Sequence, residues 1–368
     1  MISGRDSEIR EGSDLGAAVP KMASVADLPQ ALAAWRQALG PAHVLTDETA
    51  LAVARTATFP TTQRVPAIIR PANRSEIQEC MRIANASRTP VYPVSTGKNW
   101  GYGSRVPARD SCVIMDLSRL NRILDYDENL AYVRVETGVT FRQLFDFLTQ
   151  KQSNLMMSVT GSTPDSSVVA NALERGHGTG PYGDRFAHTC NLEVVLPTGE
   201  CLTTGLGRFP DAAAASVSRW GVGPHLDGLF SQSNLGIVTS MTIWLSPKPG
   251  YLQVCFLGIN DPCRLTELLD ALRVLRSQEL LRWPLHVWND LKMLSLARQY
   301  PWKESGGRTP LSPQLRECIR DDYLWGSAWT GSVGLCAASK EQGQAERCAI
   351  ERILGSKVDK LVFFDGVE

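Results

Sequence analysis

Hydrophobic positions near the start of the chain follow first a helical and then an extended spacing. Within residues 25–39 an apolar residue recurs at i, i+4, i+7 and i+11, which predicts an amphipathic helix with one buried face. The short apolar runs 67–70 and 91–94 predict strands. Between them, Ser75 and Gln78 have the spacing of a capping box, which predicts the start of a second helix. This part of the chain is therefore expected to form a β-α-β unit.

Extended patterns dominate the middle of the chain. Apolar runs at 112–117 and 130–136 predict two further strands, and residues 237–245 predict a long one. Thr140 and Gln143 form a second capping box, so another helix is expected to start there. Its buried face is expected to consist of Phe141, Leu144, Phe145 and Leu148.

Turn residues divide the rest of the chain. A hairpin is expected within residues 192–204, with its turn at Thr198-Gly199. Pro247-Lys248-Pro249-Gly250 is the clearest boundary, because proline and glycine interrupt regular structure. Beyond it, the pattern predicts a strand at 251–259, a helix marked by leucines from 265 to 272, an exposed loop at 303–313 and a final strand at 361–364.

Composition limits the number of domains and the class of partner. The 368 residues suffice for two domains, and 43% of them are hydrophobic. We expect a flexible lead over residues 1–24, a first domain over 25–249 and a second over 250–368. Lys and Arg number 38, as do Asp and Glu. The net charge is therefore zero, and no electrostatic attraction to nucleic acid or to an anionic membrane is expected.

The cysteines and the first residues favour a cytoplasmic protein. The nine cysteines are odd in number and form no CxxC pair, which is typical of reduced thiols. The first sixteen residues have no apolar core of a secretory signal, and no apolar run is long enough to span a bilayer. The histidines do not cluster, so no metal site is expected.

The most informative segment is the glycine-rich loop at residues 95–104. Glycines at 97, 101 and 103 let backbone N–H groups bend around an anion, and Lys98 adds a positive charge. A pyrophosphate would suit this loop. It matches neither a Walker loop nor the dinucleotide fingerprint that opens a helix, and a surface turn between strands is the alternative.

Two more glycine-bearing regions, 161–183 and 234–238, also lie beside expected strands. Together with the loop at 95–104 they suggest a long cofactor that crosses several backbone segments. Three independent turns are the alternative interpretation.

Five runs, in order, resemble the vanillyl-alcohol oxidase / p-cresol methylhydroxylase family of flavoproteins over residues 60–250. They are STGKNWGYGSRVP, DLSRLNRILDYDENLAYVRVETGVT, NALERGHGTGPYGDRF, LEVVLPTGECLTTGLG and FSQSNLGIVTSMTIWLSPKP. The resemblance implies an α+β fold in which two subdomains of a PCMH-type domain grip an extended FAD. A cap domain for the substrate would follow. Family members continue well beyond this chain's length, so the resemblance implies that the cap is incomplete.

The resemblance also implies which residues contact FAD. The loop would surround the pyrophosphate, and three residues of the second glycine region would lie along the cofactor. Ile237 would make a backbone contact on the adenine or ribose side. The implied contacts are Ser95, Thr96, Gly97, Lys98, Asn99, Trp100, Gly101, Tyr102, Gly103, Ser104, Asn171, Gly176, Gly183 and Ile237.

Two residues would have catalytic roles if the resemblance holds. Tyr102 matches a tyrosine that helps to bind a substrate phenolate, and a hydroxyl donor favours that oxyanion. Asp165 falls where one branch carries an aspartate near flavin N5, and a carboxylate there could exchange a proton. From the residues alone, a hydrophobic lid and an Asx cap are the alternatives. Thr179 stands where relatives often have a tyrosine.

The implied activity is hydride transfer from a benzylic C–H of a para-substituted phenol or alcohol to flavin N5. Electrons would pass on to O2 or a cytochrome, and a homo-oligomer is left open. The alternative is a flavin-binding module without a complete substrate site.

Overall fold

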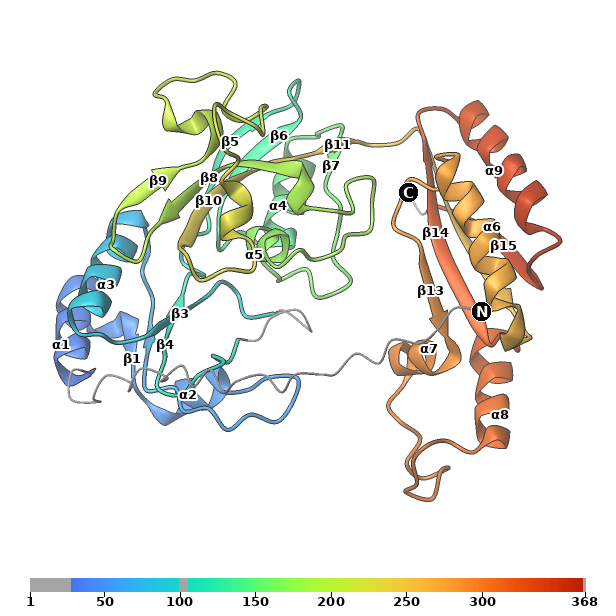
Figure 1. The fold of residues 1–368 in the computed structure, drawn as a ribbon, viewed down its shortest axis with the longest axis horizontal. Coiled ribbons are helices and arrows are strands. Elements are labelled where there is room, and N and C mark those ends of the chain that lie inside the picture. The colour runs from blue at the N-terminus through green and yellow to red at the C-terminus, as the bar shows by residue number, and fades with distance from the viewer. Residues whose placement is uncertain (1–27, 99–104, 367–368) are drawn as a thin grey trace, which may run out of the picture.

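The structure, a computed structural model, describes residues 28–98 and 105–366. Figure 1 shows two bodies, one from blue to yellow and one from orange to red, joined by the chain between β11 and β12. The first body contains two sheets, and the second contains one sheet flanked by helices.

The first sheet has the strand order β1-β2-β4-β3, in which β2 and β3 run parallel to β4. Helices α1 and α3 pack together on it, and the core buries Trp35, Ile69, Ile77 and Met115. This parallel arrangement brings the end of β3 and the loop after it to one edge of the sheet. The bounds are α1 Leu28–Leu39, β1 Val44–Leu45, α2 Glu48–Ala54, β2 Ile68–Ile69, α3 Arg74–Ala86, β3 Val91–Val94 and β4 Val113–Asp116.

Helix α3 begins earlier than its sequence indicated. Asn73, not Ser75, is the N-cap, and its side chain accepts a hydrogen bond from Glu76 N at 3.0 Å. The Glu76 carboxylate in turn accepts from Ala72 N at 2.7 Å. The expected capping box at Ser75 is therefore wrong, because Asn73 caps the helix two residues earlier and Glu76 accepts from the backbone just before it.

The second sheet is antiparallel, with the order β5-β6-β10-β8-β9. The hairpin expected around Thr198-Gly199 is confirmed by the pairing of Val195 with Cys201. Helices α4 and α5 contribute to the core of this sheet. The bounds are β5 Ile123–Asp127, β6 Tyr132–Glu136, α4 Phe141–Gln150, β7 Leu155–Met156, α5 Val168–Leu173, β8 Thr189–Val195, β9 Cys201–Thr203, β10 Ile237–Trp244 and β11 Ser246–Pro247.

The capping box of α4 is confirmed, since Thr140 and Gln143 bond each other's backbone N–H groups. Its expected buried face is only partly right. Phe141, Leu144 and Leu148 are buried, whereas Phe145 is 62% exposed. The helix is covered on one side only, so the buried stripe is narrower than the apolar pattern suggested.

The second body is a four-stranded antiparallel sheet of order β13-β14-β12-β15, with α6 and α9 packed on it. The strand expected at 251–259 is confirmed as β12. No helix or strand was predicted between residues 283 and 354, where the structure has five. The bounds are β12 Tyr251–Ile259, α6 Leu265–Ser277, β13 His286–Asn289, α7 Asp290–Ala297, α8 Pro313–Leu324, β14 Trp329–Ala337, α9 Lys340–Leu354 and β15 Lys360–Asp365.

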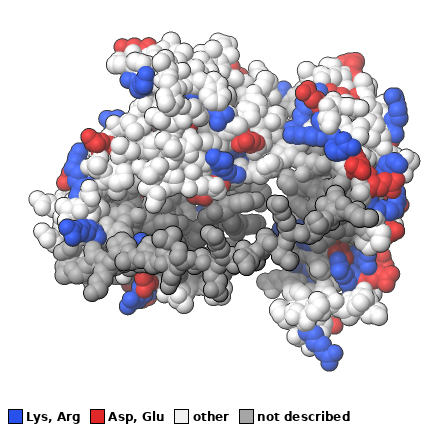
Figure 2. Space-filling model, viewed as in Figure 1, with Lys and Arg blue, Asp and Glu red and all other residues white. Residues whose placement is uncertain are grey.

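Charged side chains of both signs are interspersed on the face seen in Figure 2, in keeping with the zero net charge. Among the described residues, no helix is long and apolar enough to cross a membrane.

Candidate functional site

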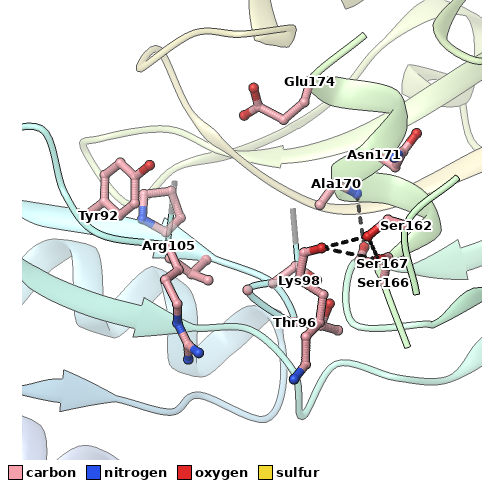
Figure 3. A pocket seen from close by; sticks show the side chains of 14 residues that line it. Tyr92, Thr96, Lys98, Arg105, Ser162, Ser166, Ser167, Ala170, Asn171 and Glu174 are labelled. Carbon is pink, nitrogen blue, oxygen red and sulfur yellow. Dashed lines mark hydrogen bonds between the residues drawn. The ribbon is translucent and has the colours of Figure 1, made fainter. Parts of the chain in front are cut away.

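A cavity lies between the end of β3 and helix α5 (Figure 3). One wall consists of residues 92–98 and Arg105, and the other comes from the segment that leads into α5 and from α5 itself. The lining residues of this second wall are Ser162, Ser166, Ser167, Ala170, Asn171 and Glu174.

A single backbone carbonyl ties the two walls together. Ser95 Oγ, at the end of β3, donates to Thr137 O at 2.7 Å. Ser167 Oγ, the N-cap of α5, donates to the same oxygen at 2.6 Å and also accepts from Ala170 N at 2.9 Å. These buried bonds fix the width of the cavity, because each wall is held to the same atom.

One end of the cavity is closed by serine hydroxyls. Ser162 Oγ donates to Lys98 O at 2.9 Å, and Ser166 Oγ donates to the same carbonyl at 3.4 Å (Figure 3). The Lys98 backbone is thereby held against the start of α5, while its side chain carries a positive charge at this end.

The other end lies between Tyr92 and Glu174. Burial raises the pKa of both groups, and for Tyr92 the negative charge of Glu174 raises it further. In Figure 3 Glu174 enters from α5 opposite the wall that carries Tyr92 and Arg105.

Gly97 and Arg105 form a close contact in the β3 wall. Gly97 has a φ of +65°, which glycine adopts without strain, and a Cβ there would lie 3.2 Å from Arg105 Nε. Arg105 Nε is buried and has no hydrogen-bond partner in the described part of the chain. An anionic ligand would supply the missing acceptor. Two cations, Lys98 and Arg105, and the hydroxyl of Thr96 therefore fit the pyrophosphate of FAD.

Behind Asn171 lies a second buried cation. Arg185 is 6% exposed, donates to Asn171 Oδ1, and donates to Ser158 O at 3.1 Å. Burial lowers the pKa of Arg185 to about 10. A Cβ on Gly176 would collide with the Asn171 side chain, so this glycine is required for the close packing.

Several residues expected to contact FAD line the cavity, namely Ser95, Thr96, Gly97, Lys98 and Asn171. Gly176 is buried behind Asn171, and a Cβ on Gly183 would meet Pro284 of the second body. Ile237 is the first residue of β10 and pairs with Val195. The contacts expected for Gly176, Gly183 and Ile237 stay predictions. So do those of Asn99, Trp100, Gly101, Tyr102, Gly103 and Ser104, which lie outside the described residues.

Asp165 does not line the cavity. It is on the surface, and Arg142 Nε donates to its carboxylate at 2.9 Å, with 53% of the Asp165 side chain exposed. This hydrogen bond lowers the pKa of Asp165. Its expected position near flavin N5 stays a prediction.

Sequence reasoning missed Tyr92, Arg105, Ser162, Ser166 and Glu174 as lining residues. The spacing of Asn171 and Glu174 offered one signal, because residues three apart on a helix share a face. The others meet only through the tertiary fold.

A second cavity lies at the opposite ends of β3 and β4, and its lining includes Arg55, Arg64, Arg88 and Arg109. Arg64 is paired there with Asp110, and Arg55 with Glu48. Its charges are thus partly compensated within the protein.

The model of a family described as an FAD binding domain matches residues 65–205. A 1'-carboxy-chondrochloren decarboxylase from Chondromyces crocatus is 54% identical over 91% of this chain and 62% of its own length. The 4-cresol dehydrogenase [hydroxylating] flavoprotein subunit from Pseudomonas putida is 34% identical over 71% of this chain and 50% of its own length. The chain thus spans less than two thirds of these curated relatives.

Two solved structures share the fold. Substrate-bound p-cresol methylhydroxylase superposes with a TM-score of 0.88 at 28% identity, covering 93% of this chain and 66% of that one. The 4-ethylphenol oxidase from Gulosibacter chungangensis gives a TM-score of 0.84 at 26% identity, covering 93% and 65%. These matches confirm the expected α+β, PCMH-type FAD-binding fold. The chain belongs to the vanillyl-alcohol oxidase / p-cresol methylhydroxylase family of FAD-binding oxidoreductases, and its cofactor is FAD.

Proposed function

We propose that this protein is an FAD-dependent oxidoreductase that removes a hydride from a carbon attached to the ring of a para-substituted phenol or a related benzylic alcohol. The observation that carries the proposal is the likeness of 93% of the chain to two structures named for p-cresol and 4-ethylphenol. Bound FAD supplies a two-electron acceptor for such a reaction.

The residues of the β3–α5 cavity would hold the cofactor. Lys98 and Arg105 would offset the negative charge of its pyrophosphate, and the Thr96 hydroxyl beside them would donate a hydrogen bond. The shared bonds of Ser95 and Ser167 to Thr137 O keep the walls in place without help from the ligand. A preorganised site of this kind loses little entropy on binding.

Tyr102 is proposed to bind the substrate's phenolic oxygen and to favour its ionised form. Asp165 is proposed as a proton acceptor, although its pairing with Arg142 makes the carboxylate a weaker base. To accept a proton efficiently, this carboxylate must first leave the guanidinium.

A carboxyl-bearing substrate is a second candidate, favoured by the 54% identity to a protein named as a decarboxylase. When a phenol carries a carboxylate on the carbon next to its ring, that carbon can lose CO2 instead of a hydride. The phenolic proton leaves as well, and the electron pair of the broken C–C bond, equal to the pair that a hydride carries, would be taken up by the two-electron acceptor that bound FAD supplies. The products are then CO2 and a two-electron-oxidised phenol.

The final electron acceptor is proposed to be O2 or a cytochrome, the latter because one relative is named as a flavoprotein subunit. The competing proposal is a flavin-binding module without a complete substrate site.

The test is anaerobic mixing of the FAD-loaded protein with 4-alkylphenols, benzylic alcohols and 4-hydroxyphenyl compounds that carry a carboxylate on the benzylic carbon. Bleaching of the yellow flavin absorbance supports oxidation, and release of CO2 identifies the second candidate. A spectrum unchanged by every compound, with FAD still bound, contradicts both and leaves the flavin-binding module.

A further inference from the structure

We propose that Glu174 recognises the adenosine half of FAD by accepting hydrogen bonds from its ribose hydroxyls or its adenine amino group. This inference rests on the FAD site that underlies the proposed function, and it is independent of the substrate.

The cavity has two chemically different ends. At one end, Ser162 and Ser166 hold the Lys98 carbonyl, and the Lys98 side chain supplies positive charge. At the other end, Glu174 lies near the start of β3, close enough to Tyr92 for its charge to raise the pKa of the tyrosine hydroxyl. An extended ligand that follows β3 therefore meets positive charge first and a carboxylate last.

Glu174 is the one carboxylate among the described residues that line this cavity. Within the described part of the chain, no ion pair compensates it, although burial of its side chain favours the neutral acid. The Glu174 carboxylate is therefore available to accept hydrogen bonds from a ligand in the cavity. A carboxylate repels phosphate but accepts hydrogen bonds from neutral hydroxyl and amino donors, so the pyrophosphate belongs at the Lys98 end.

Contacts at the end of α5 favour adenosine over the ribityl chain as the neighbour of Glu174. Gln232 Nε2 donates to Glu174 O at 3.2 Å, and Ser231 Oγ donates to Leu173 O at 3.0 Å. The end of the helix is thus fixed to the loop that leads into β10, so the position of Glu174 is held without help from a ligand. The ring of Tyr92 offers a flat apolar face for a purine beside it.

Residues 177–183, which follow Glu174 in the chain, contact the second body. His177 and His286 of β13 are in edge contact, with ring centroids 5.9 Å apart, and Gly183 packs against Pro284. The proposal places the flavin half of the cofactor toward that side and adenosine at the Glu174 end.

The experiment compares three ligands on protein freed of flavin. FAD and ADP contain the adenosine half, whereas FMN contains only the flavin half. Dissociation constants are measured by flavin fluorescence for FAD and FMN and by calorimetry for ADP. The variants are Glu174→Gln and Glu174→Ala, with Glu200→Gln, which changes an exposed glutamate, as the matched control.

We expect both Glu174 variants to bind FAD and ADP about 10–100-fold more weakly, since hydrogen bonds to charged groups are strong, and to bind FMN unchanged. Equal weakening of FMN would assign Glu174 to the flavin half, and unchanged or tighter FAD binding would also overturn the proposal. Thermal unfolding identifies a misfolded variant, and Glu174→Asp, which retains the acceptor, should recover part of the affinity. If the proposed oxidation is wrong, only the substrate assay fails. The ADP titration tests the role of Glu174 independently of that assay.

Discussion

The charges at the start of α7 in the second body and those around the β3–α5 cavity in the first body are compensated in opposite ways. In the second body, the Asp290 carboxylate is 2% exposed and receives two hydrogen bonds from Arg316 at 2.6 Å, with Arg320 at 3.5 Å. In the first body, Arg105 Nε has no acceptor, and Glu174 has no cation, within the described residues. Charges compensated by the protein itself serve its architecture, whereas charges left uncompensated around one cavity indicate where a ligand completes the network.

The largest expected effect is on stability and belongs to the second body. Asp290→Ala should lower the free energy of unfolding by about 3–5 kcal/mol, because two arginines lose their buried partner. FAD affinity should stay unchanged. Urea denaturation followed by circular dichroism measures the first, and flavin fluorescence the second.

Asp270→Ala is the matched control, since its pair with Arg273 is exposed and worth less than about 1 kcal/mol. A loss of FAD affinity in Asp290→Ala without a loss of stability would contradict the difference between these two regions.

Arg105→Gln should give the opposite result. Removing the cation should weaken FAD binding about 10–100-fold, because a charge-assisted hydrogen bond to a phosphate is lost. The free energy of unfolding of the apoprotein should barely change, since no acceptor in the described chain is left unpaired. If Arg105→Gln instead destabilised the apoprotein and left the FAD dissociation constant unaltered, Arg105 would be structural.

Ser167→Ala tests a residue that both stabilises the fold and positions the walls of the cavity. The α5 N-cap and the bond to Thr137 O would be lost, which should cost about 1 kcal/mol of stability. FAD affinity should fall by a few-fold, because the spacing of the walls is less well fixed. Ser312→Ala, which removes the N-cap of α8, is a control that should cost similar stability at no cost in affinity.

The smallest effect is a pH dependence. Burial raises the pKa of Glu174 and so favours its neutral acid in the apoprotein. Protonated Glu174 therefore makes the folded apoprotein more stable at low pH, and this stability is lost as the pH rises through the raised pKa. Adenosine recognition requires the ionised form, so ADP affinity should fall as pH drops through the same pKa. Titrations across the acidic range should show this fall for wild type and a flat profile for Glu174→Gln. A wild-type profile that matches the variant would remove Glu174 from the contact.

Local signals made parts of the fold predictable. The capping box of Thr140 and Gln143 involves neighbours on one helix turn, and seven of the nine residues of β12 are apolar or aromatic. The start of α3 was misjudged because Asn73 competes with Ser75 for the same role. Helix α8 and strand β13 were missed because they are defined by contacts distant in the sequence. Strand β13 pairs with β14, and α8 packs against α7.

The residues of the site also divide into those with a local sequence signal and those defined only by tertiary contacts. The segment Ser95–Lys98 has a glycine and donor pattern that can be recognised from the sequence, and it lines the cavity. Arg105 and Glu174 carry no such pattern, because an uncompensated charge is defined by the absence of a partner in space. The catalytic assignment of Asp165 depended on a resemblance alone, and the structure gives this residue a surface ion pair with Arg142.

The central claim is that FAD occupies the cavity between β3 and α5. A crystal structure of the FAD complex tests it most directly. The account predicts density for the pyrophosphate beside Lys98 and Arg105 and for adenosine beside Glu174. Density for the cofactor in the second cavity, among Arg55, Arg64 and Arg88, or a reversed cofactor with its flavin ring at Glu174, would contradict it.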